Sequence, residues 1–208
     1  MNEAQVIAVD LDGTLTLTDT LYESVLTLVR TKPYFLLLLP FWLFKGIAHL
    51  KQKVAEHTEL DVTTLPYNQP LIDWLKEEKL RGKKIVLSTA ANEKIAEAVV
   101  GNFDFFDAFI ASDSKTNLKS ARKRDALQQR YGDKGYDYAG NSNDDLEVWA
   151  GASNAIVVNA SEYVLQKASK LTSVTQVFLS ERASIAVWLR ALRNHQWLKN
   201  LLLFVPLL

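Results

Sequence analysis

The chain has 208 residues, 48% of them hydrophobic, and its 24 Lys and Arg balance 24 Asp and Glu. This size and apolar content predict one folded domain, or one domain with a sizeable insertion, and exclude a disordered chain. Zero net charge argues against a nucleic-acid partner, and the absence of cysteine excludes disulfide scaffolds, thiol catalysis and cysteine-bound metals. The first residues lack the basic and apolar pattern of a secretory signal, so the globular part is expected in the cytoplasm.

Short apolar runs alternate with helix-like stretches along most of the chain, which predicts an α/β fold with a parallel sheet and crossover helices. Strands are expected at 6–9, 84–87, 108–111, 136–139 and 155–158, and helices at 93–100, 121–131 and 146–151. Most of these strands run into small polar residues. Because ligands of open α/β sheets bind beyond the carboxyl ends of the strands, the functional site is expected there.

Residues 17–80 interrupt this rhythm and read as helices at 19–30, 42–55 and 71–79. Within them, residues 34–44 (YFLLLLPFWLF) are apolar without interruption. As a helix these residues would span about 17 Å, and Pro40 interrupts it, so they cannot cross a bilayer alone. Two interpretations stay open: the buried centre of a helical cap, or a wedge that dips into the face of a membrane.

The charge balance shifts in residues 181–208, which carry a net charge of +3, so that residues 1–180 carry −3. This basic segment runs into the apolar sequence NLLLFVPLL, which predicts the first part of a membrane helix. The apolar run falls short of the roughly 20 residues that a spanning helix needs, so the chain is expected to stop inside one. The alternative is an amphipathic helix that docks on the core.

The strongest chemical signal is the sequence VDLDGTL at residues 9–15, directly after the first expected strand. Asp10 and Asp12 stand two residues apart in an extended segment, so they point the same way, and Gly13 lets the chain turn after them. Two such carboxylates need a cation or a shared proton between them. A calcium loop would need further oxygen ligands downstream in an acidic run with a closing Glu, and Thr16, Thr18 and Asp19 fit that pattern poorly. A surface turn with two solvated carboxylates is the remaining alternative.

This segment resembles the first motif of the haloacid dehalogenase-like (HAD) hydrolases, a strand followed by DxDGTL. Further segments agree in order: Ser88 after the second strand, Lys119 and Lys123 ahead of the fourth, and GNSNDD at 140–145 after the fourth. The resemblance implies a Rossmann-like HAD core at 1–18 and 80–180 and an inserted helical C1-type cap at 19–79. Residues 181–208 form the basic and apolar C-terminal segment.

The resemblance also implies a phosphatase mechanism. Asp10 would attack phosphorus as the nucleophile, and Asp12 would protonate the leaving oxygen and later activate water. Ser88 and a lysine would neutralise the phosphoryl oxygens. Thr14, Thr89 and Lys119 are expected to contact the substrate.

Mg²⁺ is the expected cofactor, held by Asp10, the backbone carbonyl of Asp12, and Asn141 and Asp145 of the loop after the fourth strand. Asn141 stands where the family usually has a metal-binding Asp, and an amide brings no negative charge, which puts turnover in question. For the catalytic lysine, Lys123 is preferred because its spacing to Leu127 suits the start of a helix, with Lys119 in reserve.

The C-terminal sequence LRALRNHQWLKNLLLFVPLL is similar to the first membrane helix of UbiA-type polyprenyl transferases, some of which carry an N-terminal HAD domain. The resemblance implies a phosphatase at the cytoplasmic face of a membrane, attached through this segment. Its substrate would be a phosphorylated small molecule or a lipid-linked sugar phosphate. The alternatives are a non-catalytic domain that binds a phosphorylated ligand beside a membrane prenyltransferase and, more weakly, phosphoryl transfer to an acceptor other than water.

Overall fold

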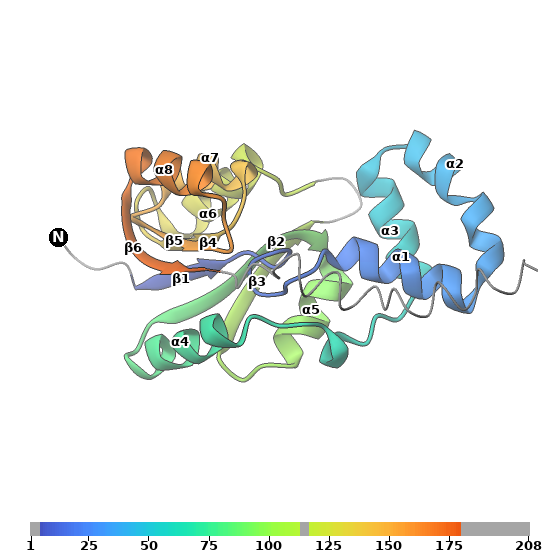
Figure 1. The fold of residues 1–208 in the computed structure, drawn as a ribbon, viewed down its shortest axis with the longest axis horizontal. Coiled ribbons are helices and arrows are strands. Elements are labelled where there is room, and N and C mark those ends of the chain that lie inside the picture. The colour runs from blue at the N-terminus through green and yellow to red at the C-terminus, as the bar shows by residue number, and fades with distance from the viewer. Residues whose placement is uncertain (1–4, 113–116, 180–208) are drawn as a thin grey trace, which may run out of the picture.

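The computed structural model describes residues 5–112 and 117–179, which form a parallel sheet with helices on both faces (Figure 1). The six strands lie in the order β3-β2-β1-β4-β5-β6. Their bounds are Val6–Val9 (β1), Lys84–Asn92 (β2), Phe106–Ser112 (β3), Asp137–Gly140 (β4), Asn154–Val158 (β5) and Ser173–Phe178 (β6). The predicted α/β class with a parallel sheet is confirmed.

Strand β1 lies at the centre of the sheet and is buried along its whole length. Burial on both faces explains its unbroken run of apolar residues. Val9 pairs with Leu87 of β2 on one side and with Ala139 of β4 on the other. The residues that follow these three, Asp10, Ser88 and Gly140, therefore come together at the carboxyl edge, where the strand order reverses.

Helices cover the two faces of the sheet in separate groups (Figure 1). One face packs against α4 (Gln69–Leu80) and α5 (Glu93–Gly101), and the other against α6 (Ala121–Tyr131), α7 (Leu146–Gly151) and α8 (Glu162–Leu171). Alternate residues of β1 serve the two cores: Ile7 and Val9 pack in the first, Val6 and Ala8 in the second.

The cap is a helical unit between β1 and α4, which extends away from the sheet (Figure 1). It consists of α1 (Thr20–Thr31), a 3-10 turn (η1, Pro33–Leu37), α2 (Leu39–Phe44) and α3 (Ile47–His57) around a small core of its own. The two segments that connect the cap to the sheet lie side by side, because Leu17 N donates to Pro66 O at 2.8 Å. A second 3-10 turn (η2, Val62–Thr64) lies in the returning segment.

Several expected bounds differ from the structure. The cap was expected to end at residue 79, but α4 belongs with the sheet because Leu71 and Leu75 are fully buried in its core. The helix expected at 42–55 is two helices, interrupted at Gly46, whose φ of 104° a helix cannot contain. Strand β2 runs five residues beyond the expected end at residue 87. Helix α8 and strand β6 were not expected at all.

The apolar stretch at 34–44 is not the buried centre of the cap, so that interpretation is wrong. Phe35 is buried and Leu39 and Trp42 are partly buried, whereas the other eight side chains are exposed. The stretch does not form one continuous helix: it folds as a 3-10 turn followed by α2, with Pro40 in the first turn of α2.

The C-terminal segment predicted to start a membrane helix, residues 181–208, lies outside the described residues. Within the range that the structure does describe, none of the helices combines the length and apolar character needed to cross a membrane.

Candidate active site

The site is built around an ion pair between Asp10 and Lys123. Asp10 follows β1, where its backbone N–H donates to Ala139 O at 2.9 Å, and Lys123 lies in the first turn of α6. Lys123 Nζ donates to Asp10 Oδ1 at 2.6 Å, and both residues are buried. The sequence therefore brings together two side chains that are 113 residues apart.

Behind this pair, Tyr138 and Asp145 complete a buried network. Lys123 Nζ also donates to the Tyr138 hydroxyl at 3.0 Å, and that hydroxyl donates to Asp145 Oδ1 at 2.8 Å. Asp145 Oδ2 accepts hydrogen bonds from the backbone N–H groups of Asn141 and Ser142, both at 3.0 Å, and from Ser142 Oγ at 3.1 Å. Asp145 thus shapes the loop after β4 and holds Tyr138 against Lys123, in addition to any contact with a metal.

Asp12 joins the site to the cap. Its Oδ1 accepts a hydrogen bond from the backbone N–H of Thr20 at 2.7 Å, at the first residue of α1. A helix N-terminus offers unpaired N–H groups, so it favours a carboxylate at this place. The position of Asp12 therefore depends on where the cap helix begins.

The predicted hydroxyl residues are all buried at this edge of the sheet. Ser88 Oγ and Thr14 Oγ1 make no hydrogen bond within the described part of the chain, whereas Thr89 Oγ1 accepts one from Ala91 N at 2.9 Å. Neighbouring strands lie about 4.8 Å apart, which puts Ser88 beside Asp10. A buried hydroxyl without a partner costs free energy, so the position of Ser88 beside Asp10 calls for an explanation beyond packing.

Most of these groups face one cavity of about 370 Å³ between the sheet edge and the cap. Asp10, Asp12 and Lys123 line it from the core, and Leu21, Ile47 and Lys51 line it from the cap. Ser88, Thr14 and Thr89 are not among the lining residues, so they lie behind its surface.

Of the two candidate lysines, Lys123 is the one that contacts Asp10. Lys119 lies at the mouth of the cavity, where Nζ pairs with Asp144 Oδ2 at 2.9 Å, and 56% of its side chain is exposed. This geometry suits a contact with the outer part of a substrate, as expected for Lys119.

Oxygen ligands for Mg²⁺ gather at the same cavity. In the described residues no group of three or more His, Cys, Asp or Glu side chains is placed to hold a metal ion. Asp10, Asp12 and Asn141 all line the cavity, however, and Asn141 packs directly against Gly13, where a methyl group would overlap its amide. Carboxylate and amide oxygens are the donors that Mg²⁺ prefers, so these residues fit the metal with fewer charges than a cluster of acids would supply.

Burial governs the protonation of the site. It raises the pKa of Asp10 from 3.8 to about 7, although the neighbouring Lys123 opposes the rise. Burial also raises the pKa of Asp12, against the hydrogen bond from Thr20. For Lys123, burial acts to lower the pKa, but Asp10, Asp145 and Asp12 together raise it. Lys123 therefore keeps its positive charge, and burial shifts the pKa of Asp12 in the direction that favours its protonated form.

Sequence reasoning missed Lys51 and Tyr138. Lys51 Nζ donates to Ala90 O at 2.7 Å and lies close enough to Asp12 and Asp19 to feel their charges. Nothing in the sequence of α3 separates Lys51 from solvated lysines such as Lys53. The signal for Tyr138 was present, because a tyrosine in a fully buried strand needs a partner for its hydroxyl.

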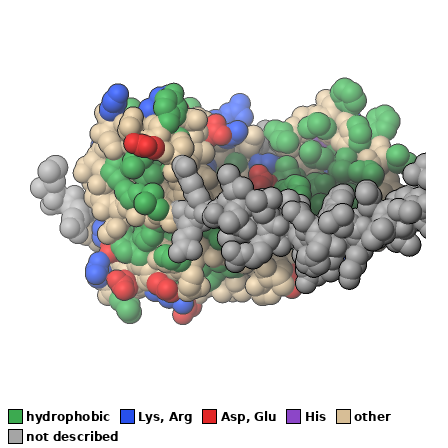
Figure 2. All heavy atoms as spheres, in the orientation of Figure 1, with side chains coloured by type: hydrophobic (Ala, Val, Ile, Leu, Met, Phe, Trp, Pro, Cys, Tyr) green, Lys and Arg blue, Asp and Glu red, His purple; other side chains and the backbone are tan. Residues whose placement is uncertain are grey.

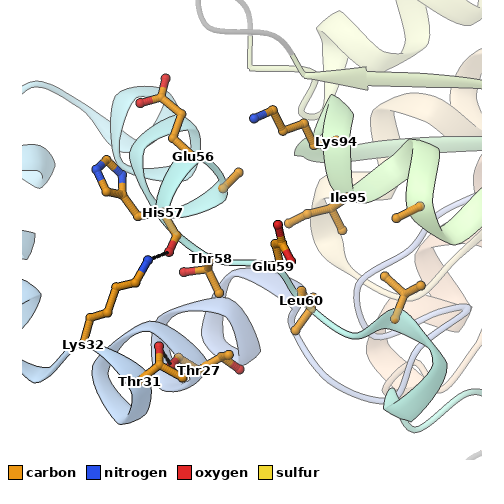
Figure 3. Close-up of a pocket in the computed structure, with 13 residues that line it drawn as sticks. Thr27, Thr31, Lys32, Glu56, His57, Thr58, Glu59, Leu60, Lys94 and Ile95 are labelled. Atoms are coloured by element: carbon orange, nitrogen blue, oxygen red, sulfur yellow. Dashed lines mark hydrogen bonds between the residues drawn. The ribbon is translucent and has the colours of Figure 1, made fainter.

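A larger cavity of about 670 Å³ lies between α1, α3 and α5 (Figure 3). None of the predicted site residues lines it. Lys32, which borders it, donates from Nζ to His57 O at 2.9 Å within the cap (Figure 3). We therefore place the candidate active site at the smaller cavity, where the charged groups converge.

Comparison with known proteins finds no family model that matches the chain. The uncharacterized protein y4nM of Sinorhizobium fredii (strain NBRC 101917 / NGR234) is 35% identical over 200 residues. The match covers 95% of this chain but 38% of that protein, so the chain spans well under half the length of this curated relative.

Solved structures show the fold more directly. A HAD family hydrolase from Salmonella enterica subsp. enterica serovar Typhi matches with a TM-score of 0.59 and 13% identity, over 83% of this chain and 66% of that one. Phosphoserine phosphatase in its apo form matches with a TM-score of 0.57 and 17% identity, over 84% of this chain and 93% of that one. The chain therefore has the fold of the HAD hydrolases, as the sequence motifs predicted.

Proposed function

We propose that this domain is a Mg²⁺-dependent phosphomonoester hydrolase that works through an aspartyl-phosphate on Asp10. The observation that carries the proposal is the 2.6 Å contact between Asp10 and the buried Lys123, beside the unpartnered hydroxyl of Ser88. The fold, shared with phosphoserine phosphatase, supports the same chemistry. A buried ion pair with a vacant hydrogen-bond donor next to it is suited to an anionic, tetrahedral group.

In the first step, Asp10 attacks phosphorus and the bond from phosphorus to the ester oxygen breaks. Because Lys123 holds Oδ1, the attacking atom is Oδ2. Asp12 donates its proton to the departing oxygen, and its raised pKa suits that task. Ser88 Oγ and Lys123 Nζ donate hydrogen bonds to the phosphoryl oxygens as charge builds on them.

In the second step, Asp12 takes a proton from a water molecule, which attacks phosphorus and breaks its bond to Asp10. Inorganic phosphate leaves, and Asp12 is protonated again. When bound by Asp10, Asp12 and Asn141, Mg²⁺ would neutralise charge between the nucleophile and the phosphoryl group.

The proposed substrate is a phosphorylated, lipid-linked sugar at the cytoplasmic face of a membrane. Its support is the mixed lining of the cavity, where Leu21 and Ile47 of the cap stand opposite the charged residues of the core. The basic and apolar pattern of residues 181–208 supports a membrane location, and their similarity to UbiA-type transferases supports a membrane enzyme as the partner.

The test is hydrolysis of an aryl phosphate by the purified chain, with Mg²⁺ or with a chelator. We expect Mg²⁺-dependent turnover that Asp10→Asn abolishes, and a mass increase of one phosphoryl group on Asp10 in rapidly quenched samples. Asp73→Asn, a matched change on the exposed face of α4, should keep full activity. Equal rates for Asp10→Asn and the unmodified chain would refute the mechanism.

A second candidate function is a non-catalytic domain that binds a phosphorylated ligand beside a membrane prenyltransferase. Asn141 favours it, because an amide at this place gives the metal no charge. Calorimetry separates the two functions: binding of phosphosugars without hydrolysis of any of a broad panel would support the accessory role.

A further inference from the structure

The tip of the cap carries a dense group of exposed apolar side chains, which Figure 2 shows as green spheres on the cap. Phe44, Leu37 and Phe41 are 89%, 74% and 66% exposed. We define the cap-tip patch as the exposed large residues of η1 and α2, namely Tyr34, Leu36, Leu37, Phe41, Leu43 and Phe44. Contiguous apolar surface of this kind marks a site of interaction, because water alone leaves it unfavourably exposed.

The charges around the patch have one sign. No Asp or Glu occurs between Glu23 and Glu56, whereas this interval contains one Arg and four Lys. Of the four lysines, Lys51 bonds to Ala90 O in the catalytic cavity and Lys53 pairs with Glu56, which leaves Lys32 and Lys45 beside the patch. Lys32 and Lys45 border the apolar stretch directly, and both are exposed. Apolar side chains framed by cations complement a surface that is apolar inside and anionic outside, which is the make-up of an anionic lipid bilayer.

The patch is followed in the chain by a helix that lines the candidate active site. Helix α3 begins at Ile47, three residues after Phe44, and Ile47 lines the catalytic cavity while remaining 43% exposed. An exposed apolar residue of the cavity lining therefore follows the patch closely along the chain, with Lys45 and Gly46 between them.

We propose that the cap-tip patch docks on an anionic lipid bilayer, with the side chains of η1 and α2 in the interfacial region and Lys32 and Lys45 at the level of the headgroups. Helix α2 has six residues, so the segment lies in the interface and does not span the membrane. The inference deepens the proposed function, because it accounts for how a lipid-linked substrate is reached, but membrane binding itself requires no turnover.

The first experiment is sedimentation of the full chain with two kinds of vesicle. One kind is made of phosphatidylcholine alone, and the other contains about 30% phosphatidylglycerol, which gives a strongly anionic surface. We expect binding to the anionic vesicles, and a loss of at least about tenfold in partition coefficient for the triple variant Leu37→Gln, Phe41→Gln, Phe44→Gln. A control variant changes three exposed apolar residues outside the cap, Leu80→Gln, Tyr163→Gln and Leu171→Gln, and should bind like the unmodified chain.

Equal binding of the patch variant and the unmodified chain would overturn the proposal, as would absence of binding by the unmodified chain. A dimer of the unmodified chain that the patch variant converts to a monomer in ultracentrifugation, without vesicle binding, would also overturn it in favour of a second copy of the chain. Aryl phosphate hydrolysis by the patch variant should be unchanged. Failure of docking is thereby distinguished from failure of the proposed catalysis.

The second experiment localises the contact. The chain contains no cysteine, so Phe44→Cys gives a unique position for an environment-sensitive fluorophore, and Leu80→Cys, at an equally exposed residue, gives the control. We expect a blue shift and quenching by nitroxide-labelled lipids at position 44 and neither at position 80. Membrane binding without a response at position 44 would show that another segment makes the contact and would refute the proposal.

Discussion

Replacing Lys123 with methionine tests the charge network that the candidate active site depends on. Methionine keeps most of the volume and the apolar stem of lysine but removes the ammonium group. That group lies 2.6 Å from Asp10 Oδ1, 3.0 Å from the Tyr138 hydroxyl and 3.9 Å from Asp145 Oδ1. The change therefore leaves two buried carboxylates without their nearest cation.

The expected cost is large. At 2.6 Å and an effective dielectric constant of about 20, the attraction between Lys123 and Asp10 is about 6 kcal/mol, which the burial of the lysine partly offsets. Removal of one partner from a buried ion pair typically costs about 3–5 kcal/mol. We expect a loss of that size in the free energy of unfolding of the metal-free protein at pH 8.5.

The loss of unfolding free energy caused by Lys123→Met should be smaller at acidic pH. Burial raises the pKa of Asp10 to about 7, so ionisation of Asp10 lowers the stability of the folded protein as pH rises toward 7. Without Lys123 the pKa of Asp10 rises further, and stability keeps falling above pH 7. At pH 5.5 Asp10 holds a proton in both the unmodified chain and Lys123→Met, so the difference between their free energies of unfolding becomes smaller.

Urea unfolding in the presence of a chelator, followed by tryptophan fluorescence, measures both effects. The matched control is Lys119→Met, which removes an exposed ion pair with Asp144 and should cost less than about 1 kcal/mol at either pH. Similar costs for the two variants, or a gap that does not change with pH, would refute the reasoning.

Three further predictions concern the metal and the turn after β1. Asn141→Asp should strengthen Mg²⁺ binding at least about tenfold in calorimetry, roughly 1.4 kcal/mol, because it adds a negative charge beside Asp10; an unchanged affinity would place residue 141 away from the metal. Gly13→Ala should lower the free energy of unfolding in urea by about 2–4 kcal/mol, and the control Gly82→Ala by about 1 kcal/mol. Both residues have positive φ, but only a methyl group at Gly13 overlaps Asn141. Equal losses for the two variants would contradict the close packing of Gly13 against Asn141. The apparent Mg²⁺ affinity should fall about tenfold per pH unit below pH 7, where Asp10 must lose its proton to bind the metal, and a flat profile in calorimetry would exclude Asp10 as a ligand.

The parts of the fold and site that the sequence predicts are those encoded over a few adjacent residues. Strand β1 is apolar throughout because it is buried on both faces, and Asp10 and Asp12 follow it at once. Lys123 could be found because it and Leu127, one turn apart, are the buried positions of α6. In each case, local spacing carries enough information to orient the side chain.

The parts that sequence reasoning misses depend on contacts between distant segments. Strand β6 lies at the edge of the sheet and is mostly exposed, so it lacks the apolar run that reveals β1. Lys51 enters the site because the cap folds over the core and brings its ammonium group to Ala90 O. The exposure of residues 34–44 has the same origin, because hydrophobicity alone does not tell whether a second surface is present to cover them.

Asp12 links the two parts of the molecule in a way that bears on catalysis. Its carboxylate is partly buried where the cap meets the core, and it accepts a hydrogen bond from the backbone N–H of Thr20, the first residue of the cap helix α1. Burial raises the pKa of Asp12 and the hydrogen bond from Thr20 lowers it, so both influences on this carboxyl depend on how the cap lies against the core. The acid proposed for the reaction is therefore positioned by the cap as well as by the core, which is why the first residue of α1 bears on the chemistry of a site built on the sheet.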